Sequence, residues 1–368
     1  MTIIIFIIVL AVLILVHEFG HFIIAKLSGI RVDEFALGFP PKAFSWKPKS
    51  SETTYSVNWI PFGGFVKIFG EDGEDAPADS PDASRSFVHK PKIVQIAVLA
   101  AGVVFNIIFA WLLIALGFMV GIPGSVTEDT QGVVGTPAIT VVSVLDGSPA
   151  AQAGLKGGDM FLELRSGETV LTDDVSVPAV QEFIGANNGK EITIMYQRED
   201  SKLQTTVIPQ EGIVPGKGAI GIGLDMVATV KLPLHKALWE AGATTVQLTK
   251  RIAVGLGTFI VNAVKGDGDF SQVAGPVGIV GLVGDAAQQG FIMLISFTAF
   301  ISLNLAVINL IPFPALDGGR ILFVIIESIK GSPISPKVAQ TVNTAGFALL
   351  LLLMVVITIS DVIKLVIH

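Results

Sequence analysis

The sequence predicts a polytopic α-helical membrane protein with four transmembrane helices, an inserted extracytoplasmic α+β domain and a membrane-associated β-hairpin. Three observations predict this class. Of the 368 residues, 51% are hydrophobic and 15% are charged, which excludes an ordinary soluble domain. Four apolar runs reach the roughly 20 residues that span about 30 Å of hydrocarbon. The stretch 125–226 is instead mixed in polarity and patterned like strands.

These patterns divide the chain into segments. Transmembrane segments are expected at residues 1–27, 93–121, 291–330 and 345–368. Between them we expect a cytoplasmic region with the β-hairpin at 28–92, the inserted domain at 125–226 and an amphipathic helical segment on the membrane surface at 227–290. A Gly-Pro-Val-Gly sequence at 275–278 is expected to end that amphipathic segment before the third span.

Charge and cysteine content exclude several function classes. The net charge of −7 and a pI near 5.3 come without any basic patch, so no nucleic-acid partner is expected. The chain has no cysteine, which excludes disulfides, thiolate zinc sites and cysteine nucleophiles together.

The first apolar segment predicts the orientation of the chain. It lacks the basic start and the small-residue cleavage site of a signal peptide, so we expect an uncleaved helix. No Lys or Arg precedes it, whereas nine lie between Lys26 and Lys92. The positive-inside rule therefore places residues 28–92 in the cytoplasm, and the N-terminus, the inserted domain and the C-terminus outside.

Within the first span lies the pentapeptide His17-Glu18-Phe19-Gly20-His21. A charged group at the centre of a membrane helix costs about 3 kcal/mol on insertion scales, so such residues are candidates for function. His17 and His21 share one helix face about 5–6 Å apart and can bind one metal ion. Glu18 can then reach a water molecule at that metal, which is the arrangement of zinc proteases.

The cytoplasmic region contains the predicted β-hairpin. Residues 53–59 alternate between apolar and polar side chains, and Pro61-Phe62-Gly63-Gly64 supplies a turn before the apolar run 65–69. The hairpin either packs on itself or dips toward the membrane with a strand edge open to peptide. The acidic stretch 71–82 is expected to be a flexible linker.

The second span contains Gly102 and Asn106, four residues apart. A glycine allows two helices to approach closely, and an asparagine in lipid needs a hydrogen-bond partner. We expect both residues to serve helix packing rather than direct chemistry.

The inserted domain resembles a PDZ domain. The resemblance is carried by Gly147-Ser148-Pro149-Ala150 and by the run 153–159, Ala-Gly-Leu-Lys-Gly-Gly-Asp, with strands expected at 140–145, 160–165, 191–197 and 203–208 and helices at 150–155 and 180–186. PDZ domains bind extended peptides as an added strand. The domain either binds a substrate tail in this way or covers the site and restricts access to it.

A catalytic zinc usually has three protein ligands, so one ligand is missing from the first span. The other histidines, His89, His235 and His368, lie outside the interior of the spans. Asp317 is the better candidate, because two prolines precede it and break the third segment. Irregular backbone at membrane depth is tolerated where it is buried or lines a wet cavity. The alternative is an interfacial aspartate at the start of a helix.

These motifs together resemble the site-2 protease family of intramembrane zinc metalloproteases. The carriers are His17-Glu18-x-x-His21 and Asn309-x-x-Pro312-x-Pro314-x-Leu316-Asp317-Gly318, with Gly102-x-x-x-Asn106 and the loop 61–67 matching in position and type. A domain between the second and third spans fits the bacterial regulator-of-sigma-E protease branch. One departure is that the enterobacterial member carries two PDZ domains, whereas this chain has room for one.

The resemblance implies a function and a role for each motif residue. It implies a zinc endopeptidase of the bacterial inner membrane that cuts single-span proteins, such as anti-sigma factors or remnant signal peptides, after an earlier cut outside. One Zn²⁺ would be held by His17, His21 and Asp317, with Glu18 as the base. Asn309 would contact the substrate backbone, and the hairpin at Gly63, Gly64 and Phe65 would clamp the substrate as an added strand.

Two other functions compete with the protease. A metal transporter or channel also places His and Asp in membrane spans, but it predicts a relay of polar residues across the membrane and gives no reason for a glutamate beside a histidine. A catalytically silent adaptor that works through its PDZ domain predicts the loss of a site residue, and His17, Glu18, His21 and Asp317 are all present.

Overall fold

The structure is a computed structural model that describes residues 1–71, 82–127, 130–145, 147–172, 176–198, 201–214, 216–266 and 274–367. It contains two compact units. The first comprises Met1–Gly117 and Leu234–His368, and the second comprises Phe118–Pro233. Most of the predicted acidic linker, residues 72–81, lies outside the described residues.

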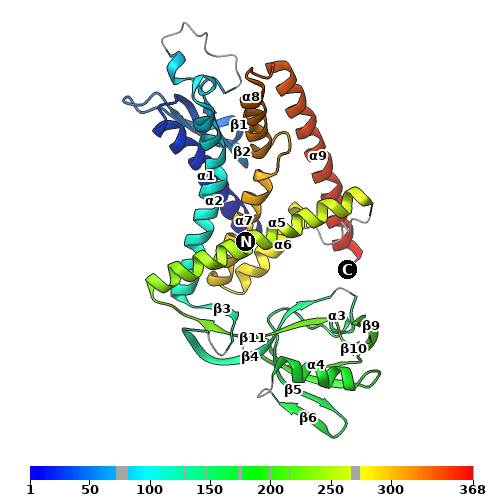
Figure 1. Cartoon of the computed structure of the whole chain (residues 1–368). Coiled ribbons are helices and arrows are strands. Elements are labelled where there is room, and N and C mark those ends of the chain that lie inside the picture. The colour runs from blue at the N-terminus through cyan, green and yellow to red at the C-terminus, as the bar shows by residue number, and fades with distance from the viewer. Residues whose placement is uncertain are drawn as a thin grey trace. The chain divides into compact units, whose positions relative to one another are not determined.

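The first unit is helical apart from one small sheet (Figure 1). Its helices are α1 (Thr2–Leu27), α2 (Lys92–Val120), α5 (Leu234–Lys265), α6 (Pro276–Gln288), α7 (Phe291–Leu310), α8 (Asp317–Lys330) and α9 (Pro336–Ile367), with two short 3₁₀ turns at Ala83–Arg85 and Phe87–His89. Four of the described helices, α1, α2, α7 and α9, are long and apolar enough to cross a membrane.

Three predicted boundaries in this unit change. The segment 291–330 consists of two helices, α7 and α8, because the prolines after Leu310 end the first of them. The fourth span begins at Pro336 rather than residue 345, since its first turns carry polar residues that lower the hydropathy. The predicted break at 275–278 is the start of α6, where Pro276 occupies the first helical turn, a position that tolerates proline.

Helices α1 and α2 pack in direct backbone contact. At Gly20 of α1, a Cβ atom would lie 2.5 Å from the carbonyl oxygen of Ala101 in α2, closer than real Cβ atoms approach. Leu13, His17 and His21 are buried on the same side of α1, whereas outward residues such as Ile8 are more than half exposed. In a membrane these exposed apolar side chains face lipid, so only the contact side of α1 depends on protein packing.

The small sheet corrects the predicted hairpin. It is formed by β1 (Val32–Trp46) and β2 (Thr54–Ile68). Residues 32–37 of β1 pair on one side with residues 64–68 of β2 and on the other side with residues 54–57 of β2. Residues 54–57 in turn pair with residues 44–46 at the end of β1. The two runs predicted to pair directly are therefore separated by β1. The alternation in 53–59 is real, but the intervening strand, with Pro40 and Pro41 in its middle, gave no strand signal.

A hydrogen bond joins helix α5 to α2. The indole N–H of Trp111 donates to the carbonyl oxygen of Leu238 at 2.9 Å. Ala237, Ala241 and Thr245 are buried at four-residue spacing, while Trp239 is 79% exposed. The helix is thus amphipathic, as its sequence predicts.

The second unit is a mixed α and β domain. Its main sheet has the strand order β3-β11-β4-β5-β7-β8, with β6 paired to β5 and a separate β9–β10 pair. The elements are β3 (Ile122–Ser125), β4 (Val133–Val144), α3 (Pro149–Gln152), β5 (Met160–Ser166), β6 (Thr169–Thr172), α4 (Val177–Ala186), β7 (Ile192–Arg198), β8 (Ser201–Val207), β9 (Gln210–Val214), β10 (Lys217–Ala219) and β11 (Ile222–Val230). The four strands and two helices predicted here overlap β4, β5, β7, β8, α3 and α4, although β4 begins seven residues before the predicted strand.

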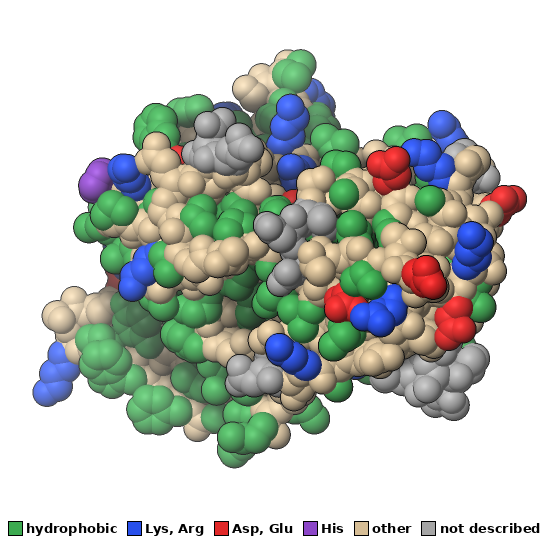
Figure 2. Space-filling view, turned by 90° about the horizontal axis from the view of Figure 1, so that it is seen from below, with side chains coloured by type: hydrophobic (Ala, Val, Ile, Leu, Met, Phe, Trp, Pro, Cys, Tyr) green, Lys and Arg blue, Asp and Glu red, His purple; other side chains and the backbone are tan. Residues whose placement is uncertain are grey.

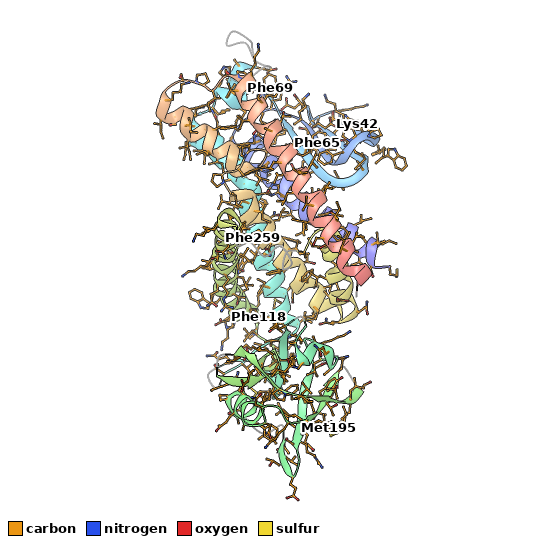
Figure 3. The ribbon with its side chains drawn as sticks, turned by 90° about the vertical axis from the view of Figure 1, so that its right-hand side faces the viewer. Lys42, Phe65, Phe69, Phe118, Met195 and Phe259 are labelled. Carbon is orange, nitrogen blue, oxygen red and sulfur yellow. The ribbon has the colours of Figure 1, made fainter. Side chains whose placement is uncertain are left out.

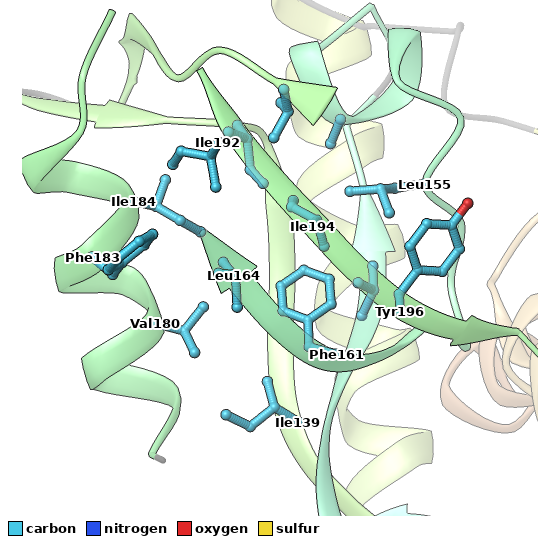
Figure 4. Packing of buried hydrophobic residues seen from close by; sticks show 14 residues of the cluster. Ile139, Leu155, Phe161, Leu164, Val180, Phe183, Ile184, Ile192, Ile194 and Tyr196 are labelled. Carbon is cyan, nitrogen blue, oxygen red and sulfur yellow. The ribbon is translucent and has the colours of Figure 1, made fainter. Parts of the chain in front are cut away.

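An apolar core holds the second unit together. Phe161 and Leu164 of β5 and Ile192 and Ile194 of β7 are at most 1% exposed, and α4 covers them through Val180 and neighbours (Figure 4). The surface differs, because Lys, Arg, Asp and Glu side chains are interspersed on the face drawn in Figure 2. The unit therefore has the core and surface of a domain that faces water.

A buried ion pair closes one end of this core. Asp159 is fully buried and accepts hydrogen bonds from Arg198 Nε at 2.7 Å, Arg198 Nη2 at 2.8 Å and the backbone N–H of Lys156 at 2.8 Å. A buried carboxylate needs such a full set of donors. The Gly-Gly-Asp sequence singled out at 157–159 thus has a structural role in this unit.

Candidate active site

Three side chains from α1 and α8 meet in the first unit. His17 and His21 project from the same face of α1, and Asp317 is the first residue of α8. His17 Nε2 lies 3.0 Å from Asp317 Oδ2, His21 Nε2 lies 3.5 Å from the same oxygen, and the two Nε2 atoms are 3.3 Å apart. Residues that are 296 positions apart in the sequence thus form one group that could hold a metal ion.

The geometry of this group fits zinc. Four ligands at 2.0–2.1 Å around a tetrahedral Zn²⁺ lie about 3.3–3.4 Å from one another. The three distances observed bracket that value. Asp317 Oδ2 is buried without a hydrogen-bond partner of good geometry, as expected where acceptor atoms converge on a cation. Three protein ligands leave a fourth position for water or substrate.

The ring of His21 is oriented by a backbone carbonyl. Its Nδ1 lies 2.8 Å from the carbonyl oxygen of Val98 in α2. A carbonyl can only accept, so Nδ1 carries the proton and Nε2 presents its lone pair to the ligand group. Metal-ligating histidines generally have such a partner for the second nitrogen.

His17 has a corresponding partner in Asn106, which is fully buried in α2. The side-chain nitrogen of Asn106 lies 3.2 Å from His17 Nδ1, and Asn106 Oδ1 is buried without a partner. The oxygen and nitrogen of an amide are assigned from such networks. Exchanging them lets Oδ1 accept from the Nδ1–H of His17, which satisfies the orphaned oxygen and leaves His17 Nε2 free for the metal.

Gly102 leaves space for both imidazole rings. A Cβ atom at this position would lie 2.4 Å from His21 Nε2 and 2.6 Å from His17 Cε1, far inside van der Waals contact. The backbone of α2 therefore forms one wall of the ligand group, and any side chain at Gly102 displaces a ligand. Gly102 therefore lies at the close contact of α1 with α2, as expected from the sequence, and also borders the two imidazole rings.

A tight turn presents Asp317. Helix α7 ends at Leu310 and α8 begins at Asp317, with six residues between them. A Cβ at Gly318 would lie 2.3 Å from the carbonyl oxygen of Ile311, and one at Gly319 would lie 2.1 Å from that of Phe313. The two glycines that follow Asp317 are thus required by the close return of the chain.

Glu18 lies beside the ligand group but not in it, because its side chain leaves α1 about 100° from that of His17. It faces the small sheet. A Cβ at Gly64 of β2 would lie 3.1 Å from Glu18 Cγ and 2.9 Å from Ile14 Cγ2. The run 64–68 pairs with β1 on one edge only among the described strands. An open strand edge therefore begins next to the glutamate.

Of the remaining predicted substrate-binding residues, Gly63 and Phe65 lie in the same strand as Gly64, and Asn309 lies in α7. Gly63 adopts φ +128°, and a Cβ there would overlap the ring of Phe39. Phe65 is half-buried in the same run of the sheet (Figure 3). Asn309, near the end of α7, is half-buried, and its side chain makes no hydrogen bond within the described residues. Gly63, Phe65 and Asn309 do not belong to the group that could hold a metal ion. Their roles in substrate binding stay predictions.

Several supporting residues escaped the sequence analysis. Ser302 Oγ donates to the backbone oxygen of Asn106 at 2.8 Å and ties α7 to α2. Two ion pairs fix α8: Arg320 with Glu71 at 2.5 Å and Glu327 with Lys92 at 2.6 Å. Ion pairs between distant segments leave no pattern in one sequence. The contact of α7 with α2 could have been predicted from Ser302, because small polar residues in an apolar span often lie at helix contacts.

Membrane-length helices around two histidines and an aspartate, with a glutamate beside the first histidine, define a membrane metalloprotease. The model of peptidase family M50 matches residues 5–353. The chain belongs to this family, which comprises the site-2 proteases, and it is a zinc metalloprotease.

Several known proteins are similar in sequence to this chain over nearly its whole length. A protein of Clostridium perfringens named as a zinc metalloprotease is 37% identical over 95% of this chain and 95% of its own. One of Nostoc is 37% identical over 93% of this chain and 91% of its own. The regulator of sigma-W protease RasP of Bacillus subtilis is 31% identical over 98% of each. Among solved structures, the PDZ domain of an SdrC-like protein from Listeria monocytogenes matches 25% of this chain and 90% of its own, with 27% identity and a TM-score of 0.21.

Proposed function

We propose that this protein is an intramembrane endopeptidase that hydrolyses peptide bonds in single-span membrane proteins after a first cut has removed their outer domain. One observation carries the proposal. The group of His17, His21 and Asp317 takes its two histidines from α1 and packs against α2, and both helices are long and apolar enough to cross a membrane. Its similarity to RasP, which is named as a regulator of sigma-W protease, supports anti-sigma-factor-like substrates.

Each site residue has a proposed role. One zinc ion, when bound to His17, His21 and Asp317, supplies a Lewis acid for the peptide carbonyl and lowers the pKa of water. Glu18 is the general base: it accepts a proton from the attacking water and returns it to the leaving amine. Asn309 has no partner among the described residues, which leaves its amide able to donate to the substrate backbone.

The small sheet is proposed to hold the substrate in an extended form. A helical substrate hides its carbonyls in hydrogen bonds, so it must unwind before attack. The open edge of 64–68 offers backbone groups to an added strand, and Gly64 brings that edge against Glu18. Gly64→Val should therefore impair cleavage and leave the zinc content unchanged, whereas Gly255→Val, at a position with open space around it, should change neither.

The proposed location is the bacterial inner membrane. The excess of Lys and Arg between the first two spans supports an orientation with that region in the cytoplasm and with the N-terminus, the second unit and the C-terminus outside. His17 is fourteen residues from Ile3 and Lys26 follows His21 by five, so the site is nearer the cytoplasmic end of α1. The second unit is proposed to act as a PDZ domain that admits trimmed substrates, by binding their tails or by excluding bulky domains.

The test uses Glu18→Gln with Glu240→Gln as the matched control, since Glu240 is exposed on α5. Purified proteins in liposomes are given a single-span model substrate with and without its outer domain. Glu18→Gln should abolish cleavage and keep its zinc, and wild type should cut only the trimmed substrate. Cleavage by Glu18→Gln would remove Glu18 as the base. Equal cleavage of both substrates would contradict the requirement for a first cut.

A further inference from the structure

One residue next to the metal ligand has an unusual backbone conformation. Ala315 adopts φ +74°, and it is the single non-glycine residue with positive φ among the described parts of the chain. L-amino acids disfavour this left-handed region because the Cβ atom approaches the carbonyl oxygen. Such a conformation persists only when surrounding contacts enforce it. Ala315 precedes Asp317 by two residues, so its conformation sets the direction in which the chain delivers the carboxylate.

The turn over Pro314 and Ala315 is closed by the Leu316 N–H, which donates to the carbonyl oxygen of Phe313 at 3.1 Å. Contacts from α9 support this turn from outside. Asn343 Oδ1 accepts a hydrogen bond from the backbone N–H of Ala315 at 3.3 Å. One turn later, a Cβ at Gly346 would lie 2.6 Å from Pro314 Cβ and 2.7 Å from the Pro314 carbonyl oxygen. The backbone of α9 therefore rests directly on the residue before Ala315, and the asparagine satisfies a backbone donor that the proline-broken segment leaves without a helical partner.

Helix α9 has few other contacts of this kind. Gly346 and Asp361 are the fully buried residues within the described side chains of α9. Asp361 Oδ2 accepts from the backbone N–H of Gly278 at 2.8 Å and so fixes the far end of α9 to the first turn of α6. The contact at Gly346 is thus one of two anchor points of an otherwise exposed helix, rather than one contact of many.

We propose that α9 is a positioning element for the third metal ligand. Asn343 and Gly346 hold Ala315 in the left-handed conformation, and this conformation aims Asp317 at His17 and His21. The proposal rests on the assignment of Asp317 as a ligand in the proposed function. If α9 releases the turn, Ala315 relaxes to negative φ and the carboxylate leaves the ligand group.

The proposal predicts a loss of metal affinity and its rescue. Asn343→Ala should weaken zinc binding roughly tenfold in chelator competition, the size expected for residues that orient a ligand. It should also change the visible spectrum of the Co²⁺-substituted protein. Adding Ala315→Gly should restore affinity and spectrum, because glycine adopts positive φ without help. Gln340→Ala, an exposed amide on the same helix, is the control and should match wild type.

The variants distinguish a failure of this proposal from a failure of the proposed function. Asp317→Ala must lower zinc affinity, and if it does not, the ligand assignment fails. If Asp317→Ala lowers affinity while Asn343→Ala binds zinc as wild type does, the role of α9 is overturned. If Asn343→Ala weakens binding and Ala315→Gly does not rescue it, the loss is a general effect on folding and the proposal is equally overturned. Gly346→Val should behave like Asn343→Ala, with the exposed Ala348→Val unchanged.

Discussion

The two units of this protein differ in what their closest contacts bury, although each contains an apolar cluster. In the second unit, the most deeply buried positions are apolar, such as Phe161 and Ile194. In the first unit, large apolar side chains of the helices are exposed, and the contact between α1 and α2 instead buries His17, His21 and Asn106. A water-facing domain needs apolar burial to fold. A membrane protein gains little from it, because lipid is as apolar as leucine.

Because of this difference, we expect the two interiors to have different roles. The core of the second unit supplies folding free energy, and the helix contact of the first unit is available for polar chemistry. Glycines at that contact, Gly20 and Gly102, let backbones approach and leave room for the imidazoles. A substitution in the second core should therefore affect folding alone, and one at the helix contact should affect metal binding.

The largest expected effect is on the core of the second unit. Phe161→Ala removes a side chain that is 1% exposed and should destabilise this unit by about 3–5 kcal/mol. Proteolysis of the full-length protein in increasing urea should then cut within Phe118–Pro233 at lower urea concentration, while the zinc content stays at the wild-type level. Val170→Ala, 42% exposed, is the control and should shift nothing. Zinc loss in Phe161→Ala would contradict the division of work between the units.

The converse change is Gly102→Ala. The new methyl group would lie 2.4 Å from His21 Nε2, so a ligand must move. A displacement of about 1 Å at an active site can cost on the order of 10²-fold in rate. We expect a loss of that size in cleavage, with reduced zinc content and unchanged urea sensitivity of the second unit. Gly255→Ala has open space around it and serves as the matched control. Full activity of Gly102→Ala would show that α2 is not a wall of the site.

The sequence predicts the members of the candidate metal-binding group better than the residues that support them. His17 and His21 share a helix face, and Asp317 stands after two prolines in an apolar segment, so each has a local reason to attract attention. The distances among them depend on how α1 and α8 pack, which no local pattern contains. The partnership of Asn106 with His17 was likewise hidden, because an asparagine in a span indicates only that some partner exists.

The sheet shows the same limit for strand pairing. The alternating residues 53–59 predicted a strand, and one exists there as part of β2. The partner was wrong, because β1 lies between the two runs that were expected to pair. The prolines at positions 40 and 41 break the pattern of β1, and the pairing of β1 with β2 shifts register both around them and between Val32 and Glu34. In the second unit, turn residues at 147–149 and 157–158 divide the strands cleanly, and the prediction is closer there.

The orientation of His17 is the next prediction. Asn106→Ala removes the acceptor assigned to the Nδ1–H of His17 and should weaken zinc binding about 10- to 100-fold in chelator competition. Asn106→Asp keeps an acceptor oxygen at the same place and should bind zinc nearly as wild type does. Ser302→Ala, which removes the hydrogen bond to the backbone of Asn106, is the control for packing alone. If the Asp and Ala variants lose zinc equally, Asn106 serves packing rather than orientation.

The smallest expected effect lies outside the membrane spans, in the sheet of the first unit. Glu34 accepts hydrogen bonds from Lys42 Nζ at 2.7 Å and Ser56 Oγ at 2.6 Å. Burial alone would raise the pKa of Glu34, but these two partners outweigh it and hold the pKa below its ordinary value of 4.5. The pair therefore stabilises the sheet above pH 4.5, and this stabilisation is lost as the pH falls through the lowered pKa.

Glu34→Gln should remove this pH dependence at a cost below about 1 kcal/mol at neutral pH, the range for ion pairs with one exposed partner. Hydrogen-exchange protection factors for β1 amides measure the effect, because they correct for the pH dependence of intrinsic exchange. In wild type the protection should fall as the pH drops below 4.5, through the lowered pKa of Glu34. In Glu34→Gln it should be slightly lower at pH 7 and flat below. A pH-dependent loss that persists in Glu34→Gln would assign the acid sensitivity to another carboxylate, with Glu52, paired to Arg85, as the next candidate.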